Sequence, residues 1–291
     1  MERHSRDSQG AQQPRASRAP TGGIVTTLAA SGYGHPVVMT DERGMTEHPA
    51  VVLLHSGVAD HRMWDAQVAA LRDRYRVLAP DLRGFGDRSH EPGPFSHAGD
   101  VLALLDSAGI GRAALVGSSF GGRVALETAA TAPERVSALV LLCAAYRGLP
   151  PTPDVESFGE EEDRLLEAGD LDGAVELNVR TWLGPEASTG ARGLVREMQR
   201  RAFELDAAAE ALLPAPEPRA VEVDPGELAM PALVVRGEQD LLWFRQIAGH
   251  LAQRMPQGEL VTLDWAGHLP SLERPTETAA LVGDFLDRVP R

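Results

Sequence analysis

A short glycine-flanked segment, Gly117-Ser118-Ser119-Phe120-Gly121, constrains this chain more than any other feature. It directly follows the apolar run from Ala113 to Val116, which is typical of a buried strand. The Gly-x-Ser-x-Gly spacing predicts a sharp turn from a strand into a helix, because larger side chains two residues either side of Ser119 would collide. Such a turn exposes the Ser119 hydroxyl at a sheet edge, beside the amide groups that begin the helix.

Two later segments supply an acid and a base. The run from Leu233 to Val235 predicts a buried strand that is followed by a turn at Asp240, and the run from Leu260 to Leu263 predicts a strand that is followed by His268. The carboxyl ends of parallel strands meet at one edge of a sheet, so we expect Asp240 and His268 to lie near Ser119. Glu238 and Asp264 are the alternative acids.

Short apolar runs alternate with helical patterns along most of the chain, which predicts a mostly parallel sheet with helices on both faces. The predicted strands are 50–54, 76–79, 113–116, 138–142, 232–236 and 259–263, after a hairpin at 24–28 and 36–40. The predicted helices between and after them are 63–73, 98–108, 122–131, 241–255 and 276–288.

The alternation is interrupted between residues 146 and 228. Proline-rich stretches flank three helical patterns there, at 154–168, 171–183 and 191–213. We therefore expect a core made of residues 22–145 and 229–291, interrupted by a helical insertion at 146–228. Residues 1–21 are rich in Arg, Gln, Ser and Pro and are predicted to be a disordered tail.

Four segments, taken in chain order, resemble the α/β-hydrolase superfamily. They are Leu53-Leu54-His55-Ser56-Gly57, Pro80-Asp81-Leu82-Arg83-Gly84-Phe85-Gly86, the turn at Ser119, and Gly237-Glu238-Gln239-Asp240 followed by Gly267-His268. The resemblance implies the α/β-hydrolase fold, with the helical insertion acting as a lid over the site. The sequence departs from the family at Ser56, because the family usually has His-Gly where this chain has His55-Ser56.

The resemblance also implies roles for individual residues. Ser119 would be the nucleophile, His268 the base and Asp240 the acid that orients it. The amide of Phe120 and that of either Gly57 or Val58 would form the oxyanion hole. The residues expected to contact the substrate are His55, which would also order the oxyanion loop, Ser118, Trp182 and Leu269.

The expected reaction is hydrolysis of a small carboxylic ester or lactone through an acyl-enzyme. The run Gly267 to Pro275 is similar to small bacterial serine esterases and to the 3-oxoadipate enol-lactonase-like group. One alternative is a carbon-carbon bond hydrolase of ring-cleavage products, although those relatives commonly carry Trp where this chain has Leu269. Another alternative is a non-catalytic ligand-binding protein of the same fold. Dehalogenases and epoxide hydrolases use Asp as the nucleophile, and Ser119 argues against both.

The composition limits the remaining possibilities. A net charge of −14 disfavours nucleic-acid or anionic-membrane partners. The single cysteine, Cys143, excludes an intrachain disulfide, and a cytoplasmic location is the expectation. No ligand spacing for a metal is visible, and no cofactor is expected. The oligomeric state stays open.

The predicted lid helices suggest what the site accepts. Their apolar residues would form a roof that favours short uncharged acyl groups; these are Val175, Val179, Trp182, Leu183, Leu194, Met198 and Phe203. A cluster of arginines in the same segment offers the alternative of binding a substrate carboxylate, as a dicarboxylic enol-lactone would need. These arginines are Arg180, Arg192, Arg196, Arg200 and Arg201.

Overall fold

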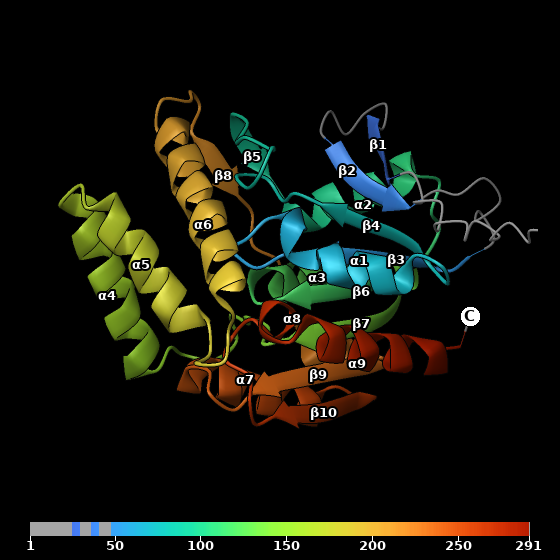
Figure 1. The fold of residues 1–291 in the computed structure, drawn as a ribbon. Coiled ribbons are helices and arrows are strands. Elements are labelled where there is room, and N and C mark those ends of the chain that lie inside the picture. The colour runs from blue at the N-terminus through green and yellow to red at the C-terminus, as the bar shows by residue number, and fades with distance from the viewer. Residues whose placement is uncertain (1–24, 30–35, 41–47, 291) are drawn as a thin grey trace, which may run out of the picture.

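A computed structural model describes residues 25–29, 36–40 and 48–290. Its centre is an eight-stranded sheet in the order β1-β2-β4-β3-β6-β7-β9-β10 (Figure 1). The strands are β1 (Val25–Ala29), β2 (Pro36–Thr40), β3 (Ala50–Leu54), β4 (Arg76–Pro80), β6 (Ala113–Ser118), β7 (Val136–Leu142), β9 (Ala232–Gly237) and β10 (Gly258–Leu263). The pairs β1–β2 and β2–β4 are antiparallel, and the other neighbours are parallel. The predicted hairpin and mostly parallel sheet are confirmed.

Helices cover both faces of this sheet. On one face lie α1 (Asp65–Leu71) and α9 (Pro275–Arg288), which pack against each other. On the other lie α2 (His97–Ser107), α3 (Phe120–Thr131) and α7 (Leu242–Arg254). The short elements are η2 (His61–Trp64), η3 (Pro133–Arg135), η4 (Pro225–Glu227), α8 (Pro270–Glu273), β5 (Gly93–Phe95) and β8 (Pro216–Pro218).

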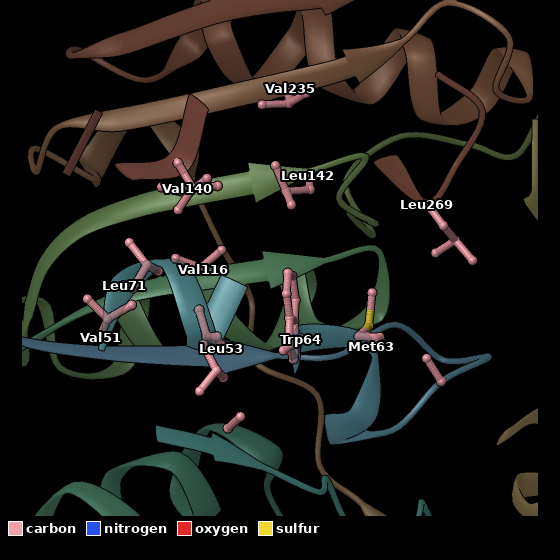
Figure 2. Close-up of a cluster of buried hydrophobic side chains, with 14 of the residues drawn as sticks. Val51, Leu53, Met63, Trp64, Leu71, Val116, Val140, Leu142, Val235 and Leu269 are labelled. Carbon is pink, nitrogen blue, oxygen red and sulfur yellow. The ribbon is translucent and has the colours of Figure 1, made fainter. Parts of the chain in front are cut away.

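Alternate residues of each central strand enter different apolar clusters. In β3, Val51 and Leu53 pack on the α1 and α9 side, whereas Val52 and Leu54 pack on the α2 and α3 side. Figure 2 shows the cluster on the α1 and α9 side, where Trp64 is fully buried beside the strands. Burial on both faces explains why these strands are unbroken apolar runs.

Three helices of the 146–228 segment stand together at one end of the sheet (Figure 1). They are α4 (Pro153–Glu167), α5 (Leu171–Trp182) and α6 (Thr189–Ala209), with α4 and α6 each packed against α5. The predicted third helix was too long, because α6 ends at Ala209 rather than Leu213. Residues 216–218 instead pair with β5 in a small parallel sheet that the sequence analysis missed. The prolines at 214, 216 and 218 lack the amide hydrogen that a helix needs, so the chain extends there.

The predicted tail, residues 1–21, lies outside the described residues. Within the described part, none of the helices combines the length and the apolar character that crossing a membrane requires.

Candidate active site

Ser119 occupies a sharp turn between β6 and α3. Its φ of 51° lies in the left-handed region, which a residue with a side chain rarely adopts. The amide of Ser119 donates to Leu142 O at 2.9 Å, and its carbonyl accepts from Ala145 N at 3.0 Å. These bonds to the end of β7 hold the strained conformation in place.

The glycines around Ser119 are there because the backbones approach closely. A Cβ on Gly121 would lie 2.1 Å from Leu54 O, and one on Gly117 would lie 2.3 Å from Gly121 O. Neither contact is possible for real atoms, and both partners are backbone atoms that cannot rotate away. The steric reason given for the Gly-x-Ser-x-Gly spacing therefore applies in this fold.

Asp240 and His268 form a buried pair. Nδ1 of His268 donates to Oδ2 of Asp240 at 2.7 Å, and the residues are 2% and 8% exposed respectively. The other carboxylate oxygen of Asp240 accepts from Leu241 N at 2.7 Å. Because Nδ1 carries the proton, Nε2 is the nitrogen left to act as a base. Asp240 follows β9 and His268 follows β10, at neighbouring strand ends.

Neither alternative acid contacts the imidazole. Glu238 forms ion pairs with Arg236 and Arg245, and Asp264 is exposed beyond the end of β10. Cys143, which follows β7, is buried behind the pair, and burial raises the pKa of its thiol well above the ordinary value.

A cavity of about 270 Å³ joins Ser119 and His268 to the helices α4, α5 and α6. Gly57 and Val58 also line it, so the loop after β3 faces the same space as the serine. No hydrogen bond joins the Ser119 hydroxyl to His268 within the described structure, and in enzymes without substrate this contact is often long.

The expected oxyanion donors lie at this site. Phe120 begins α3, and its Cβ lies 3.5 Å from where a Cβ on Gly57 would be, so the two segments are adjacent. Among the described residues, no hydrogen-bond acceptor is paired with the amides of Phe120, Gly57 or Val58. The geometry leaves both Gly57 and Val58 available as the second donor.

Of the four residues expected to contact substrate, Trp182 lines the cavity and the other three do not. His55, Ser118 and Leu269 are fully buried. Ser118 points into the core because successive strand residues face opposite sides of the sheet. Leu269 packs in the apolar cluster of the α1 face. The prediction of substrate contact is thus corrected for these three residues.

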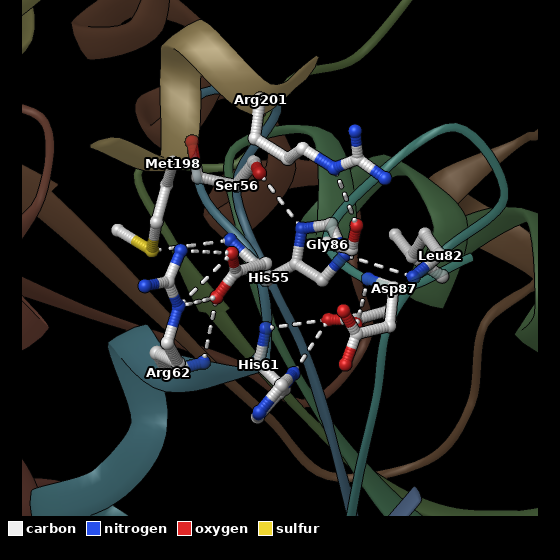
Figure 3. A network of polar contacts seen from close by, with 11 residues as sticks. His55, Ser56, His61, Arg62, Leu82, Gly86, Asp87, Met198 and Arg201 are labelled. Carbon is white, nitrogen blue, oxygen red and sulfur yellow. Dashed lines mark hydrogen bonds and ion pairs between the residues drawn. The ribbon is translucent and has the colours of Figure 1, made fainter. Parts of the chain in front are cut away.

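His55 holds two loops together. Its Nδ1 donates to Ser56 O at 2.8 Å, and its Nε2 accepts from Leu82 N at 2.9 Å (Figure 3). Burial lowers the pKa of His55, which favours the neutral ring that this pattern requires. The histidine thus joins the loop after β3 to the loop after β4.

Asp81 anchors the same region, and Figure 3 shows the network. One oxygen accepts from the His61 amide at 2.9 Å and from its Nδ1 at 2.8 Å, and the other accepts from Asp87 N at 2.9 Å. Burial acts to raise the pKa of Asp81, but the bonds and charge of His61 bring it below the ordinary value. His61 is therefore held on Asp81 through both its backbone amide and its ring.

Among the described residues, possible metal ligands lie close together in two groups. The first group is Asp60, His61 and Asp81, and the second is Cys143, Asp240 and His268. In the first group Asp60 is held by the Arg62 guanidinium and Asp81 by His61. In the second the carboxylate and imidazole bond each other. Hydrogen bonds within the protein account for both groups.

The sequence analysis missed Glu273, which holds the loop of His268. Its carboxylate accepts from Gly267 N at 2.9 Å and from Leu269 N at 3.1 Å, the amides on either side of the histidine. Burial raises the pKa of Glu273, and these bonds oppose the rise. The carboxylate belongs to the run quoted for the resemblance, but only its contacts show its task.

Phe244 was missed as well. Its ring centroid lies 4.1 Å from that of His268, and the Trp182 ring lies 4.7 Å from the same imidazole. The His268 amide also donates to Trp182 O at 3.2 Å. The end of α5 and the start of α7 therefore position the histidine together.

The predicted lid arginines do not line the cavity. Arg196 pairs with Glu176, Arg200 with Asp172, and Arg192 donates to Gly184 O. Most of the predicted apolar roof packs into the core instead, and only Trp182 and Phe203 of that set line the cavity.

A parallel sheet carrying a strained serine turn, a histidine and an aspartate at its carboxyl edge defines a class of hydrolytic enzymes. The chain belongs to the alpha/beta hydrolase family, whose sequence model matches residues 51–281.

Known proteins similar to this chain act on different bonds. It is 32% identical over 282 residues to 2-hydroxymuconate semialdehyde hydrolase of Pseudomonas sp. (strain CF600), covering 91% of each chain. It resembles the enol-lactonase of Burkholderia xenovorans LB400, with a TM-score of 0.71 and 26% identity over 87% of this chain and 96% of that one. A hydrolase of Pseudomonas aeruginosa PA01 has a TM-score of 0.71 and 29% identity, covering 91% and 99%.

Proposed function

We propose that this protein hydrolyses a small carboxylic ester or lactone through an acyl-enzyme on Ser119. The observation that carries the proposal is the 2.7 Å bond between His268 Nδ1 and Asp240 Oδ2, in a pair whose histidine shares a cavity with the strained Ser119. The similarity to an enol-lactonase supports the same class of reaction.

Each group has one task in this mechanism. His268 Nε2 takes the Ser119 proton as the hydroxyl oxygen attacks the carbonyl carbon, and Asp240 stabilises the imidazolium that forms. The amides of Phe120 and of Gly57 or Val58 stabilise the negative oxygen. The imidazolium then protonates the leaving alcohol, and water hydrolyses the acyl-enzyme by the reverse transfers.

A carbon-carbon bond hydrolase is the second candidate, because 2-hydroxymuconate semialdehyde hydrolase is a relative. Muconate-type substrates carry a carboxylate, whereas the described residues that line the cavity include two carboxylates and no arginine. The charge of the cavity therefore favours an ester or lactone without a carboxylate.

A fluorophosphonate probe tests the nucleophile. We expect one adduct at Ser119 by peptide mass spectrometry, together with hydrolysis of a 4-nitrophenyl butyrate ester. Ser119→Ala should lose both, because the alanine methyl fits the turn but has no hydroxyl.

Ser118→Ala is the matched control, since Ser118 is buried away from the cavity and its Oγ has no partner among the described residues. It should keep the Ser119 adduct. An adduct on another residue, or faster turnover of a ring-cleavage product than of the butyrate ester, would contradict the proposal.

A further inference from the structure

The lid helices present alternating aromatic and polar side chains to the cavity. On α4 these are Phe158 and Glu162, four residues apart, and on α5 they are Asn178 and Trp182, also four apart. Residues four apart in a helix lie on one face, so each helix contributes one ring and one polar group. The cavity is thus aromatic and polar rather than uniformly apolar.

Helix α6 adds Gln199 and two further lining residues, Phe203 and Asp206. Gln199 is 4% exposed, and its side-chain oxygen has no hydrogen-bond partner within the described structure. A buried acceptor without a donor costs roughly 1–3 kcal/mol. A ligand with an N–H group would remove that cost.

Glu162 is an acid with no cationic partner in the part of the chain that the structure describes. Its carboxylate accepts from the Asn178 side chain, which also donates to Ala174 O at 3.0 Å and accepts from Trp182 Nε1 at 2.7 Å. Among the described residues, no arginine or histidine forms an ion pair with it, and the sequence has no lysine.

The electrostatic surroundings of Glu162 are acidic. Burial raises its pKa, and the nearby charges of Asp163 and Asp206 act in the same direction, against the bond from Asn178. Asp206 itself is exposed and is bonded by His90 Nε2 at 2.8 Å. The net charge of −14 adds a long-range attraction for positive ligands.

We propose, building on the hydrolysis inferred above, that the substrate carries a protonated amine remote from the scissile bond. Glu162, Asp206 and Gln199 offer three acceptors, which match the three N–H donors of a primary ammonium. The rings of Phe158 and Trp182, with centroids 4.5 Å apart, add aromatic surface that attracts a cation. The structure assigns these residues to a cation subsite of the lid.

Two pairs of esters test the subsite. The two members of each pair match in size, but one ends in an ammonium group and the other in a methyl group. The first is 4-nitrophenyl 6-aminohexanoate against 4-nitrophenyl heptanoate, which places the amine in the acyl part. The second is the butyrate esters of 6-aminohexan-1-ol and heptan-1-ol, which places it in the alcohol. We expect kcat/KM to favour the ammonium member by about tenfold or more in at least one pair.

Glu162→Gln keeps the shape of the side chain and removes its charge, so it should lower that preference by about tenfold. Glu161→Gln is the matched control, because Glu161 pairs with Arg164 and does not line the cavity, and the preference should persist. A preference for the methyl member in both pairs, or a preference that Glu162→Gln leaves intact, would overturn the cation subsite.

Binding to Ser119→Ala protein separates the subsite from the reaction. Calorimetry should show tighter binding of methyl 6-aminohexanoate than of methyl heptanoate, and the added Glu162→Gln change should remove the difference. Selective binding without turnover of any ester in wild type would contradict the proposed hydrolysis and support the subsite. Turnover without ammonium selectivity would support the proposed hydrolysis and contradict the cation subsite.

Discussion

At the scale of single residues, the position of Asp240 identifies it as the carboxylate that pairs with the imidazole of His268. Three carboxylates lie close in sequence to the strand ends, but only Asp240 reaches His268. The backbone bond from Leu241 fixes the carboxylate so that one oxygen faces the imidazole. A charged acceptor at Nδ1 holds the tautomer and stabilises the imidazolium during turnover.

Asp240→Asn tests that assignment. The amide can donate to Nδ1 and favour the wrong tautomer, so we expect kcat on the butyrate ester to fall by about 10⁴-fold with the fold retained, as the same change does in a protease triad. Steady-state kinetics and circular dichroism measure the two effects. Asp264→Asn, at an exposed position, should have little effect; if it is the more damaging change, Asp240 is not the acid.

At the scale of elements, the junction of β6 and α3 depends on how closely α3 approaches β3. The approach is set at Gly121, where the backbone of Leu54 leaves no room for a side chain. Close packing at this point aligns the start of the helix, and with it the amide of Phe120, beside the loop of Gly57 and Val58.

Gly121→Ala should therefore push β3 and α3 apart. Placing a Cβ 2.1 Å from Leu54 O and 2.6 Å from His55 O should cost about 2 kcal/mol of unfolding free energy and most of the proposed hydrolysis of the butyrate ester. Urea unfolding and ester kinetics provide the measurements. Gly249→Ala in α7, where a Cβ would meet nothing within 4 Å, is the control and should raise stability by up to about 1 kcal/mol. Equal effects of the two changes would show that the junction tolerates a methyl.

At the scale of the whole molecule, the partly buried His97 couples folding to pH. His97, at the start of α2, lies nearly perpendicular to the Phe95 and Phe120 rings, with ring centroids 5.0 Å apart in both pairs. Its Nδ1 has no partner in the described structure. Burial lowers its pKa from 6.5 to about 3.

Acid should destabilise the folded protein through His97. Its pKa is lower when folded, so the unfolded chain binds the extra proton between about pH 6.5 and 3, and stability rises with pH across that window. Going from pH 7 to 5, wild type should lose about 2 kcal/mol more unfolding free energy than His97→Phe, which cannot bind the proton. Urea unfolding at both pH values gives the comparison. Equal losses in the two proteins would mean that His97 titrates normally when folded.

The sheet and the turn at Ser119 could both be predicted from local sequence patterns. Strands buried on both faces must be apolar throughout, and the glycine spacing follows from contacts between backbone atoms of neighbouring segments, so both leave a local pattern. The family resemblance placed Asp240 and His268 in the right order along the chain. These features could be predicted because each leaves a recognisable pattern in a short stretch of sequence, even where its physical cause is a contact with a distant segment, such as that of Gly121 with Leu54.

Which side chains meet depends on how distant elements pack together. Strand ends brought Asp240 rather than Glu238 to His268, and the packing of α5 and α6 buried residues such as Val179 and Met198 that an apolar stripe alone would place over the site. Helical periodicity shows that a face is apolar but not which neighbour covers it. The acidic character of the cavity arises from Glu162 on α4 and Asp206 on α6, and no local pattern records that these two helices face the same space.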